Sequence, residues 1–374
     1  MDDRTGGVRR RRFLAAGVAG AALLAGCTGG DDDAPRGADG ANGDASADGD
    51  LPGADGEVPT REATVPLADD LGAFERNARS GGVGQDGIPP IDDPAIGDVE
   101  EGDELMDGGD PIFGVERNGE YRAYPQHVLV WHEIANDELG GEPIAVTYCP
   151  LTGTAIGFER RTTTFGVSGQ LVNSNLIMYD RATESWWPQV LGTAVRGDHT
   201  GRALEEFRVT WTTWERWRET HPETTVLTEK TGYARNYDSD PYGGYNPIEG
   251  YYEDGSPMFG VMNEDDRLPD KRVVIGARSR DGALAVEKER LRESRLVEAD
   301  LDGTPYILAY DADLDTGYAY RNPDGMAFEA DGEGYTGEDG GSHPAGDLPL
   351  EPTNAFDAMW FAWAAFYPDT GLHA

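Results

Sequence analysis

The chain has little positive charge, and this scarcity narrows the classes of partner that it can have. Of its 374 residues, 70 are acidic and 31 are basic, giving a formal net charge of -39. Only three basic residues are lysines: Lys230, Lys271 and Lys288. Because nucleic-acid binding requires clustered cations, no nucleic-acid partner is expected. The acidic residues are spread along the whole chain rather than gathered on a surface for one partner. This distribution favours a halophilic protein, because high salt screens the repulsion between its acidic groups.

Cysteine and long apolar runs are also scarce. The two cysteines are Cys27 and Cys149. Without a Cys-x-x-Cys pair or a His-x-x-x-His pattern, the sequence predicts neither a dithiol switch nor a zinc motif. Beyond residue 27, no segment reaches the roughly 20 apolar residues that a membrane-spanning helix needs.

The first 27 residues have the layout of a twin-arginine lipoprotein signal. Four arginines at positions 9–12 precede a short apolar run, and Leu24-Ala25-Gly26-Cys27 is typical of a lipobox. Such a signal is removed before its cysteine, which is then acylated. We therefore expect an exported protein that is lipid-anchored through Cys27 at the outer face of the cytoplasmic membrane. The membrane is the one partner expected, and protein partners are left open.

Composition divides the remaining chain into five parts. Residues 28–62 contain few large apolar side chains and predict a disordered acidic tether. Residues 63–110 form a lead-in segment and residues 111–227 a first half. A Tyr/Gly-rich connector at residues 228–271 precedes a second half at residues 272–374.

The first half begins with signals for a hairpin, a helix and a buried strand. Asn118-Gly119 suits a type I′ turn, in which both central residues need positive φ. A helix is predicted from Pro125 to the stop at Gly140-Gly141. Its apolar stripe consists of Val128, Trp131, His132, Ala135 and Leu139. Residues 144–149 are apolar on both alternations and predict a buried strand.

The same order of signals recurs in the second half: a strand at residues 273–277, the turn Asp281-Gly282, a charged helix through Leu291 and Leu301, and a strand at residues 306–310. Four matched pairs keep one constant spacing: Gly114 and Gly276, Gly141 and Gly303, Pro143 and Pro305, Tyr148 and Tyr310. Residues 212–220 predict a short helix with Trp214 and Trp217 on one side, and these two similarly match Trp360 and Trp363. The sequence predicts a strand-rich α+β fold of two tandem pseudo-repeats, each a hairpin–helix–strands–helix unit, packed as one domain.

Cys149 and His132 are the candidate catalytic residues. The matched positions of the second half hold Asp311, and Ser294 or Arg295, so the scaffold does not require the Cys or the His. A turn after Cys149 can stabilise a thiolate. If the helix packs on the following strand, His132 could serve as a base for Cys149. The two residues could instead share a metal cofactor, such as copper or another soft ion. The alternative is a buried, inert thiol and a hydrogen-bonded core histidine.

Polar residues that interrupt an apolar strand run are the candidate ligand-binding residues. Asn173, Ser174 and Asn175 lie inside this run, and buried amides need partners. They either fix a loop or face a ligand in a cleft. Tyr179, Asp180 and Arg181 belong to the same candidate cleft, together with nearby tryptophans; the alternative for Asp180 and Arg181 is a simple ion pair.

Four stretches, at residues 131–137, 146–155, 173–181 and 240–245, resemble the DUF3179 family, a domain of unknown function found in bacteria and haloarchaea. The resemblance covers about residues 85 to 374. It implies an exported or envelope protein and supplies no activity. Some members have Cys where this chain has Thr152, so a mechanism that requires that second thiol does not operate here.

Two function classes follow from these signals, and whether the chain is an enzyme stays open. In the first, Cys149 and His132 form a redox or metal site in a surface lipoprotein. In the second, the protein is a non-catalytic ligand-binding lipoprotein with a cleft lined by Asn, Tyr and Trp.

Overall fold

Strands dominate the protein, as the sequence predicts. The computed structural model describes residues 51–253, 255–332, 334–338 and 340–374. Strands make up 41% of the structure and form several small sheets, whereas helices make up only 12%. The expected signal at residues 1–27, the expected lipidation site Cys27 and residues 28–50 of the expected tether lie outside the described residues. No helix in the described part of the chain is long and apolar enough to cross a membrane.

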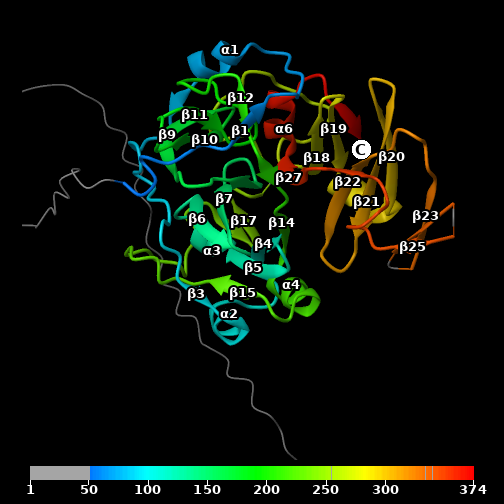
Figure 1. Ribbon diagram of the computed structural model, residues 1–374, viewed down its shortest axis with the longest axis horizontal. Helices are drawn as coiled ribbons and strands as arrows, with labels where there is room; N and C mark the ends of the chain where they lie inside the picture. Colours follow the sequence, from blue (N-terminus) through cyan, green and yellow to red (C-terminus); the bar gives the residue numbers. More distant parts are fainter. Residues whose placement is uncertain (1–50, 254, 333, 339) are drawn as a thin grey trace, which may run out of the picture. The chain divides into compact units, whose positions relative to one another are not determined.

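Two sheets of the first half hold its hairpin and its buried strand (Figure 1, cyan to green). The first has the order β14-β4-β5-β15-β3: β14 Thr210–Thr213, β4 Pro111–Arg117, β5 Glu120–Pro125, β15 Thr225–Leu227 and β3 Ile96–Gly97. The second has the order β13-β8-β7-β6: β13 Glu206–Phe207, β8 Thr154–Glu159, β7 Glu142–Cys149 and β6 Ile134–Leu139. The hairpin predicted at Asn118-Gly119 is confirmed, with φ of 51° and 79° at the turn.

The helix predicted from Pro125 to Leu139 is wrong beyond its first turn. The helix α3 covers only Gln126–Leu129, and Ile134–Leu139 is the strand β6, paired with β7. Gly140-Gly141, with φ of 60° and 75°, is the two-residue hairpin turn between them rather than a helix stop. Ala135 and Leu139 lie four residues apart, a spacing that places side chains on one face of a strand as well as of a helix.

A third sheet with the order β11-β10-β9-β2 contains the predicted ligand-binding residues. Its strands are β11 Trp186–Pro188, β10 Asn175–Asp180, β9 Phe165–Val172 and β2 Arg79–Ser80. A separate pair joins β1 Thr60–Glu62 to β12 Arg202–Leu204. Residues 51–62, expected as tether, are thus partly ordered, because their backbone pairs with the domain. Pro52 accepts a hydrogen bond from Thr164.

The second half contains three sheets (Figure 1, yellow to red). One has the order β27-β18-β19-β28: β27 Ala355–Met359, β18 Val273–Ser279, β19 Gly282–Glu287 and β28 Gly371–His373. The next has the order β20-β21-β22-β26: β20 Leu296–Leu301, β21 Thr304–Asp311, β22 Thr316–Arg321 and β26 Glu351–Thr353. The last is β23 Phe328–Asp331, β24 Gly334–Gly337 and β25 Ser342–His343.

The remaining elements are short helices and the hairpin of the connector. The helices are α1 Leu71–Arg76, α2 Val99–Leu105, α4 Trp214–Thr220, α5 Lys288–Ser294 and α6 Trp360–Phe366; the hairpin is β16 Gly243–Tyr245 with β17 Ile248–Gly250. The predicted short helix at Trp214 is confirmed. The charged helix predicted through Leu301 ends at Ser294, because Leu296–Leu301 pairs with β21.

One apolar cluster joins the two halves. It combines Cys149, Ile177 and Trp187 with Val274 and Trp363 from the second half, all with at most 1% of their surface exposed. The helix α6 lies at this junction: Phe366 stacks on Phe74 at 5.6 Å. The first half is therefore anchored to the second through a continuous core.

Candidate functional site

A buried carboxyl group lies beside Cys149, in the turn between α3 and β6. Glu133 has a φ of 58°, in the left-handed region, which is unfavourable for a residue with a side chain. Its N–H donates to the Leu129 carbonyl and its own carbonyl accepts from the Tyr148 N–H, both at 2.7 Å. These two bonds fix the backbone of the turn and aim the Glu133 side chain into the interior.

The Glu133 carboxyl has no hydrogen-bond partner within the described ranges, although the residue is only 4% exposed. Burial raises the pKa of Glu133 from 4.5 to about 8, because an isolated charge is costly away from water. At neutral pH the group is therefore mainly a protonated acid that can donate one hydrogen bond and accept others.

Cys149 ends β7 and is completely buried. The Leu176 N–H donates to its sulfur at 3.4 Å, and the thiol donates to the Ser174 carbonyl at 3.8 Å. Burial, and next the carboxyl of Glu133, raise the pKa of the Cys149 thiol to about 11. The thiolate is the nucleophilic and metal-binding form, so Cys149 is in its less reactive form at neutral pH.

Tyr242 from the connector is the third member of this cluster. Burial raises the pKa of its phenol, and the charges of Glu133 and Cys149 raise it further, so the three groups lie close together. No hydrogen bond reaches the Tyr242 hydroxyl from any described residue. Its ring also lines a cavity of about 470 Å³, together with Ile88, Val130, Trp131, Pro241 and others.

A hydrogen-bonded group of tyrosines holds the connector on the first half. Asp240 accepts bonds from Gln126 Nε2 at 2.9 Å and from the Tyr252 hydroxyl at 3.0 Å. The Tyr245 ring stacks on Tyr252 at 3.9 Å, and the Tyr148 hydroxyl donates to that of Tyr245 at 3.3 Å. Asp240 also accepts from the backbone N–H of Tyr242 at 2.7 Å. The network therefore positions Tyr242.

Residues 85–370 match the family described as "Protein of unknown function (DUF3179)". The chain belongs to the DUF3179 family. The resemblance found in the sequence is thus confirmed, and Glu133, Cys149 and Tyr242 all lie within the DUF3179 domain. Neither the curated proteins nor the solved structures contain a match to this chain.

In this DUF3179 domain, no hydrogen bond between described residues joins His132 to Cys149. His132 Nδ1 lies 2.7 Å from the Pro89 carbonyl, and Nε2 lies 2.7 Å from the Tyr237 hydroxyl. Burial lowers the pKa of His132. A neutral ring that donates from Nδ1 and accepts at Nε2 satisfies both contacts, so both ring nitrogens are occupied.

A metal centre would need further ligands around Cys149 and His132. Within the residues that the structure describes, no three His, Cys, Asp or Glu side chains are grouped so that they could hold a metal ion. The positive φ of Glu133 turns the chain between His132 and the strand that pairs with β7. The predicted continuous helix would have carried His132 towards Cys149. In the structure, this turn takes the place of that helix.

The two asparagines predicted to bind a ligand fix loops instead. Asn173 and Ser174 form the turn between β9 and β10, with φ of 53° and 59°. The Asn173 amide donates to the Ala365 carbonyl at 3.2 Å and accepts from the Met262 N–H at 2.8 Å. The Asn175 amide donates to Thr152 Oγ1 at 3.0 Å and accepts from the Val190 N–H at 2.9 Å. Both amides therefore have protein partners.

Tyr179, Asp180 and Arg181 also bond to protein groups. The Tyr179 hydroxyl donates to Asp86 at 2.6 Å. Asp180 accepts from Trp187 Nε1 at 2.9 Å, whereas Arg181 pairs with Asp92 at 2.8 Å. Asp180 and Arg181 thus bond to other residues, and the simple ion pair considered for them is not formed.

Glu133 and Tyr242 each lie in a stretch that resembles the DUF3179 family, residues 131–137 and 240–245, but neither residue type nor spacing marks them there as site residues. A glutamate beside an apolar stripe is ordinarily on the solvent side of a helix, and Tyr242 is one of several tyrosines in the connector. Their meeting depends on the turn at Glu133 and on the fold of the connector, which are tertiary features.

Proposed function

We propose that this DUF3179 protein is an exported, lipid-anchored surface protein that binds a small, partly apolar molecule in the cavity at Trp131 and Tyr242. The observation that carries the proposal is the state of Tyr242. Its ring lines a cavity of about 470 Å³, its hydroxyl has no partner among the described residues, and it lies beside the buried groups of Glu133 and Cys149.

The lining of the cavity suits an uncharged ring or short chain with one polar substituent. Ile88, Val130, Trp131 and Pro241 supply apolar and aromatic surface, and small-molecule sites are mostly apolar with a few placed polar groups. Tyr242 supplies such a group, and Arg235 and Asn236 also line the cavity. This is the ligand-binding alternative from the sequence, with Trp131 and Tyr242 in place of Asn173 and Asn175.

A redox or soft-metal site at Cys149 and His132, for copper or a similar ion, is the second hypothesis. The hydrogen bond from the Leu176 N–H to the Cys149 sulfur favours it, because such donors stabilise a thiolate. Against it, His132 would have to release the Pro89 carbonyl or the Tyr237 hydroxyl to bind a metal. The binding proposal requires no such rearrangement.

Ligand-observed NMR on the purified chain, with indole and p-cresol as probes, tests the binding proposal. Ala234 is exposed and lines the cavity, so Ala234→Trp fills the cavity from its rim without disturbing the core. We expect both probes to bind, and Ala234→Trp to weaken their binding at least about tenfold, while Ala234→Ser retains it. Failure of both probes to bind, or unchanged affinity in Ala234→Trp, would contradict the proposal.

Elemental analysis of the same sample separates the two hypotheses. A stoichiometric metal that is retained through purification and lost in Cys149→Ser would favour the metal site. Binding of the probes with no such metal would favour the cavity.

Export and anchorage rest on the sequence of the first 27 residues. The charged start, the short apolar run and the lipobox at Cys27 support them. The anchor would leave the DUF3179 domain outside the cell, where a binding cavity has access to molecules in the medium. The charge of -39 supports a protein adapted to a saline medium.

We also propose that the domain consists of two related copies of one unit. The pairing of β14, β4, β5 and β15 has the same order and directions as that of β27, β18, β19 and β28. In each, an indole N–H donates to a threonine seven residues later: Trp217 to Thr224 at 2.8 Å, and Trp363 to Thr370 at 2.9 Å. These parallels support a common unit.

A further inference from the structure

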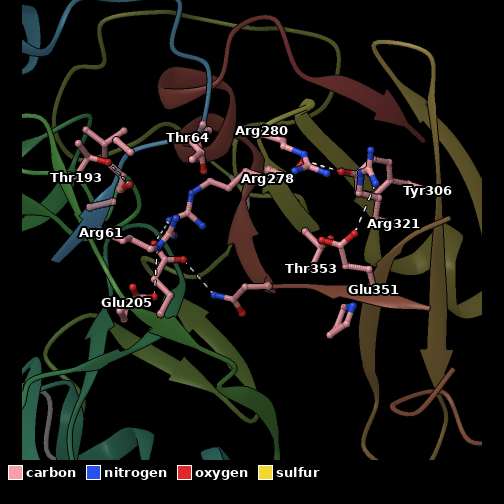
Figure 2. Close-up of a pocket in the computed structure, with 18 residues that line it drawn as sticks. Arg61, Thr64, Thr193, Glu205, Arg278, Arg280, Tyr306, Arg321, Glu351 and Thr353 are labelled. Carbon is pink, nitrogen blue, oxygen red and sulfur yellow. Dashed lines mark hydrogen bonds and ion pairs between the residues drawn. The ribbon is translucent and has the colours of Figure 1, made fainter. Parts of the chain in front are cut away.

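A second cavity, of about 380 Å³, lies between strands of the two halves (Figure 2). Arg61 of β1 and Glu206 of β13 line one side. Arg278 of β18, Arg321 of β22 and Glu351 of β26 come from the second half. It shares no lining residue with the cavity at Tyr242. The two cavities therefore do not depend on the same side chains.

Charges of both signs line this cavity in nearly equal number. Four arginines line it, Arg61, Arg278, Arg280 and Arg321, with three glutamates, Glu205, Glu206 and Glu351. In a chain with a net charge of -39, such a balance is a local departure from the general excess of acid. A purely anionic ligand would meet three carboxylates here, and a purely cationic one four guanidinium groups, and like charges in contact are unfavourable.

One of these pairs is fixed in the wall. Arg278 is buried, and its Nη2 lies 2.8 Å from Glu206 Oε1. Asn354 donates to the other oxygen of Glu206 at 3.2 Å. This triad forms the inner wall and is not free to exchange partners.

The other pairs around the cavity are loose. Arg61 lies 3.5 Å from Glu205, Arg280 lies 3.8 Å from Asp281, and Arg321 lies 3.6 Å from Glu351. These distances exceed the usual hydrogen-bond range, and exposed pairs of this kind contribute little to stability. Arg280 and Glu351 are 61% and 62% exposed. Arg321 is the exception, because its Nε also lies 2.7 Å from Asp281 Oδ2. A ligand can therefore bind Arg280 and Glu351, but not Arg321, without breaking a strong internal contact.

Two buried atoms of the lining residues lack partners in the described structure. They are Arg278 Nε, a donor, and Asn354 Oδ1, an acceptor. Buried polar atoms are normally hydrogen-bonded, so each such exception needs an explanation. Both atoms lie beneath the accessible surface of the cavity, so contacts to a ligand come from the exposed arginines and glutamates rather than from these two atoms.

We propose that this cavity binds a small zwitterion, a free amino acid or a dipeptide. The ligand carboxylate would lie between Arg61 and Arg280, and its ammonium group would lie towards Glu205 or Glu351. Figure 2 shows an arginine and a glutamate on each side of the space between them. The cavity volume falls within the range usual for small-molecule sites.

Saturation-transfer NMR and calorimetry on the purified full chain test this site. The probes are L-alanine, L-glutamate, L-lysine and L-phenylalanine, with succinate as an anion without an ammonium group and putrescine as a cation without a carboxylate. We expect at least one amino acid to bind more tightly than succinate and putrescine. Arg280→Gln and Glu351→Gln should each weaken its binding about tenfold or more, since charge-assisted bonds are the strong ones.

Two controls keep the outcome specific. Arg76→Gln removes an exposed arginine of α1 that pairs with Asp70 and should leave the affinity unchanged. Ala234→Trp, which blocks the cavity at Tyr242, should also leave it unchanged, so this site can fail or hold independently of the proposed function. Preference for succinate or putrescine, no binding by any amino acid, or unchanged affinity in both Arg280→Gln and Glu351→Gln would overturn the proposal.

Discussion

Glu133 combines three unfavourable features at one residue: burial, a positive φ and a carboxyl without a partner among the described side chains. Each costs stability, and strained or unpartnered residues concentrate at functional sites. Its charge acts on both Cys149 and Tyr242, and these costs have a purpose if a ligand supplies the missing hydrogen bond. The state of its proton then becomes the most direct property to measure.

We predict that Glu133→Gln changes how stability depends on pH. The pKa of Glu133 is about 8 in the folded chain, whereas an ordinary glutamate releases its proton near pH 4.5. Between these values the folded form keeps a proton that the unfolded form has lost, so the free energy of unfolding falls as pH rises, by up to about 1.4 kcal/mol per unit. The Gln variant lacks this slope, so its stability relative to the native chain should rise through the window and level off above about pH 8.

Urea unfolding at a series of pH values, from about 5 to about 9, measures this difference. Glu138→Gln is the matched control, because Glu138 lies in β6, the strand that follows Glu133, and is exposed. Its profile should follow that of the native chain. A Glu133→Gln profile that also runs parallel to the native one would show that the carboxyl is not buried as a protonated acid.

At the scale of elements, tight contacts between glycine and tryptophan join strands to helices. A Cβ added at Gly114 of β4 would lie 2.3 Å from Trp217 of α4. A Cβ added at Gly276 of β18 would likewise lie 2.3 Å from Trp363 of α6. Real Cβ atoms do not approach this closely, so the indole ring would have to move.

We predict that Gly114→Ala and Gly276→Ala each destabilise the domain by about 1–3 kcal/mol or more, the usual cost of overpacking a core. The costs should be similar, because both contacts have the same geometry. Gly84→Ala is the control, since nothing lies within 4 Å of the added Cβ there. Thermal or urea unfolding gives the comparison. A neutral result at either buried glycine would contradict this account of the contacts and weaken the two-copy proposal.

Two-residue turns explain both a success and a failure of sequence interpretation at this scale. Asn118-Gly119 has the composition that type I′ turns favour, so its hairpin is predictable. Gly140-Gly141 suits such a turn equally well, but it follows an apolar spacing that is compatible with a helix. Only the pairing of β6 with β7 decides between the two.

For the whole molecule, the proposed lipid anchor is the property that bears most on its role. We predict that Cys27→Ser moves the protein from the membrane fraction to the soluble fraction, because no other described segment could span the membrane as a helix and the acylated cysteine is lost. Cell fractionation followed by immunoblotting measures the distribution. Cys149→Ser, which removes the other cysteine, should stay with the membrane. Retention of Cys27→Ser in the membrane fraction would contradict the anchor.

Much of the architecture is accessible from the sequence, whereas little of the site is. Strand content, the first hairpin, the buried strand that ends in Cys149 and the short helix at Trp214 follow from local patterns. Cys149 is buried, which is the alternative that the sequence left open, and the groups that raise its pKa and that of Tyr242 include Glu133, whereas no hydrogen bond between described residues joins it to His132. The predicted binding residues Asn173 and Asn175 bond to protein groups, because sequence alone cannot tell which partner a buried amide meets.

The sequence by itself determined what depends on local chemistry: the acidic charge, the absence of clustered lysines, the alternation of strands and the family motifs. It also carries the pattern at residues 1–27 from which the anchor is proposed. The tertiary structure decided what depends on meetings between distant residues. It turned residues 134–139 into a strand, brought the connector tyrosine at position 242 against Glu133, and gathered arginines from separate strands around one cavity. Local propensity depends on neighbours along the chain. A pKa, an unpartnered carboxyl or a cavity depends on residues that are distant in the sequence but close in space.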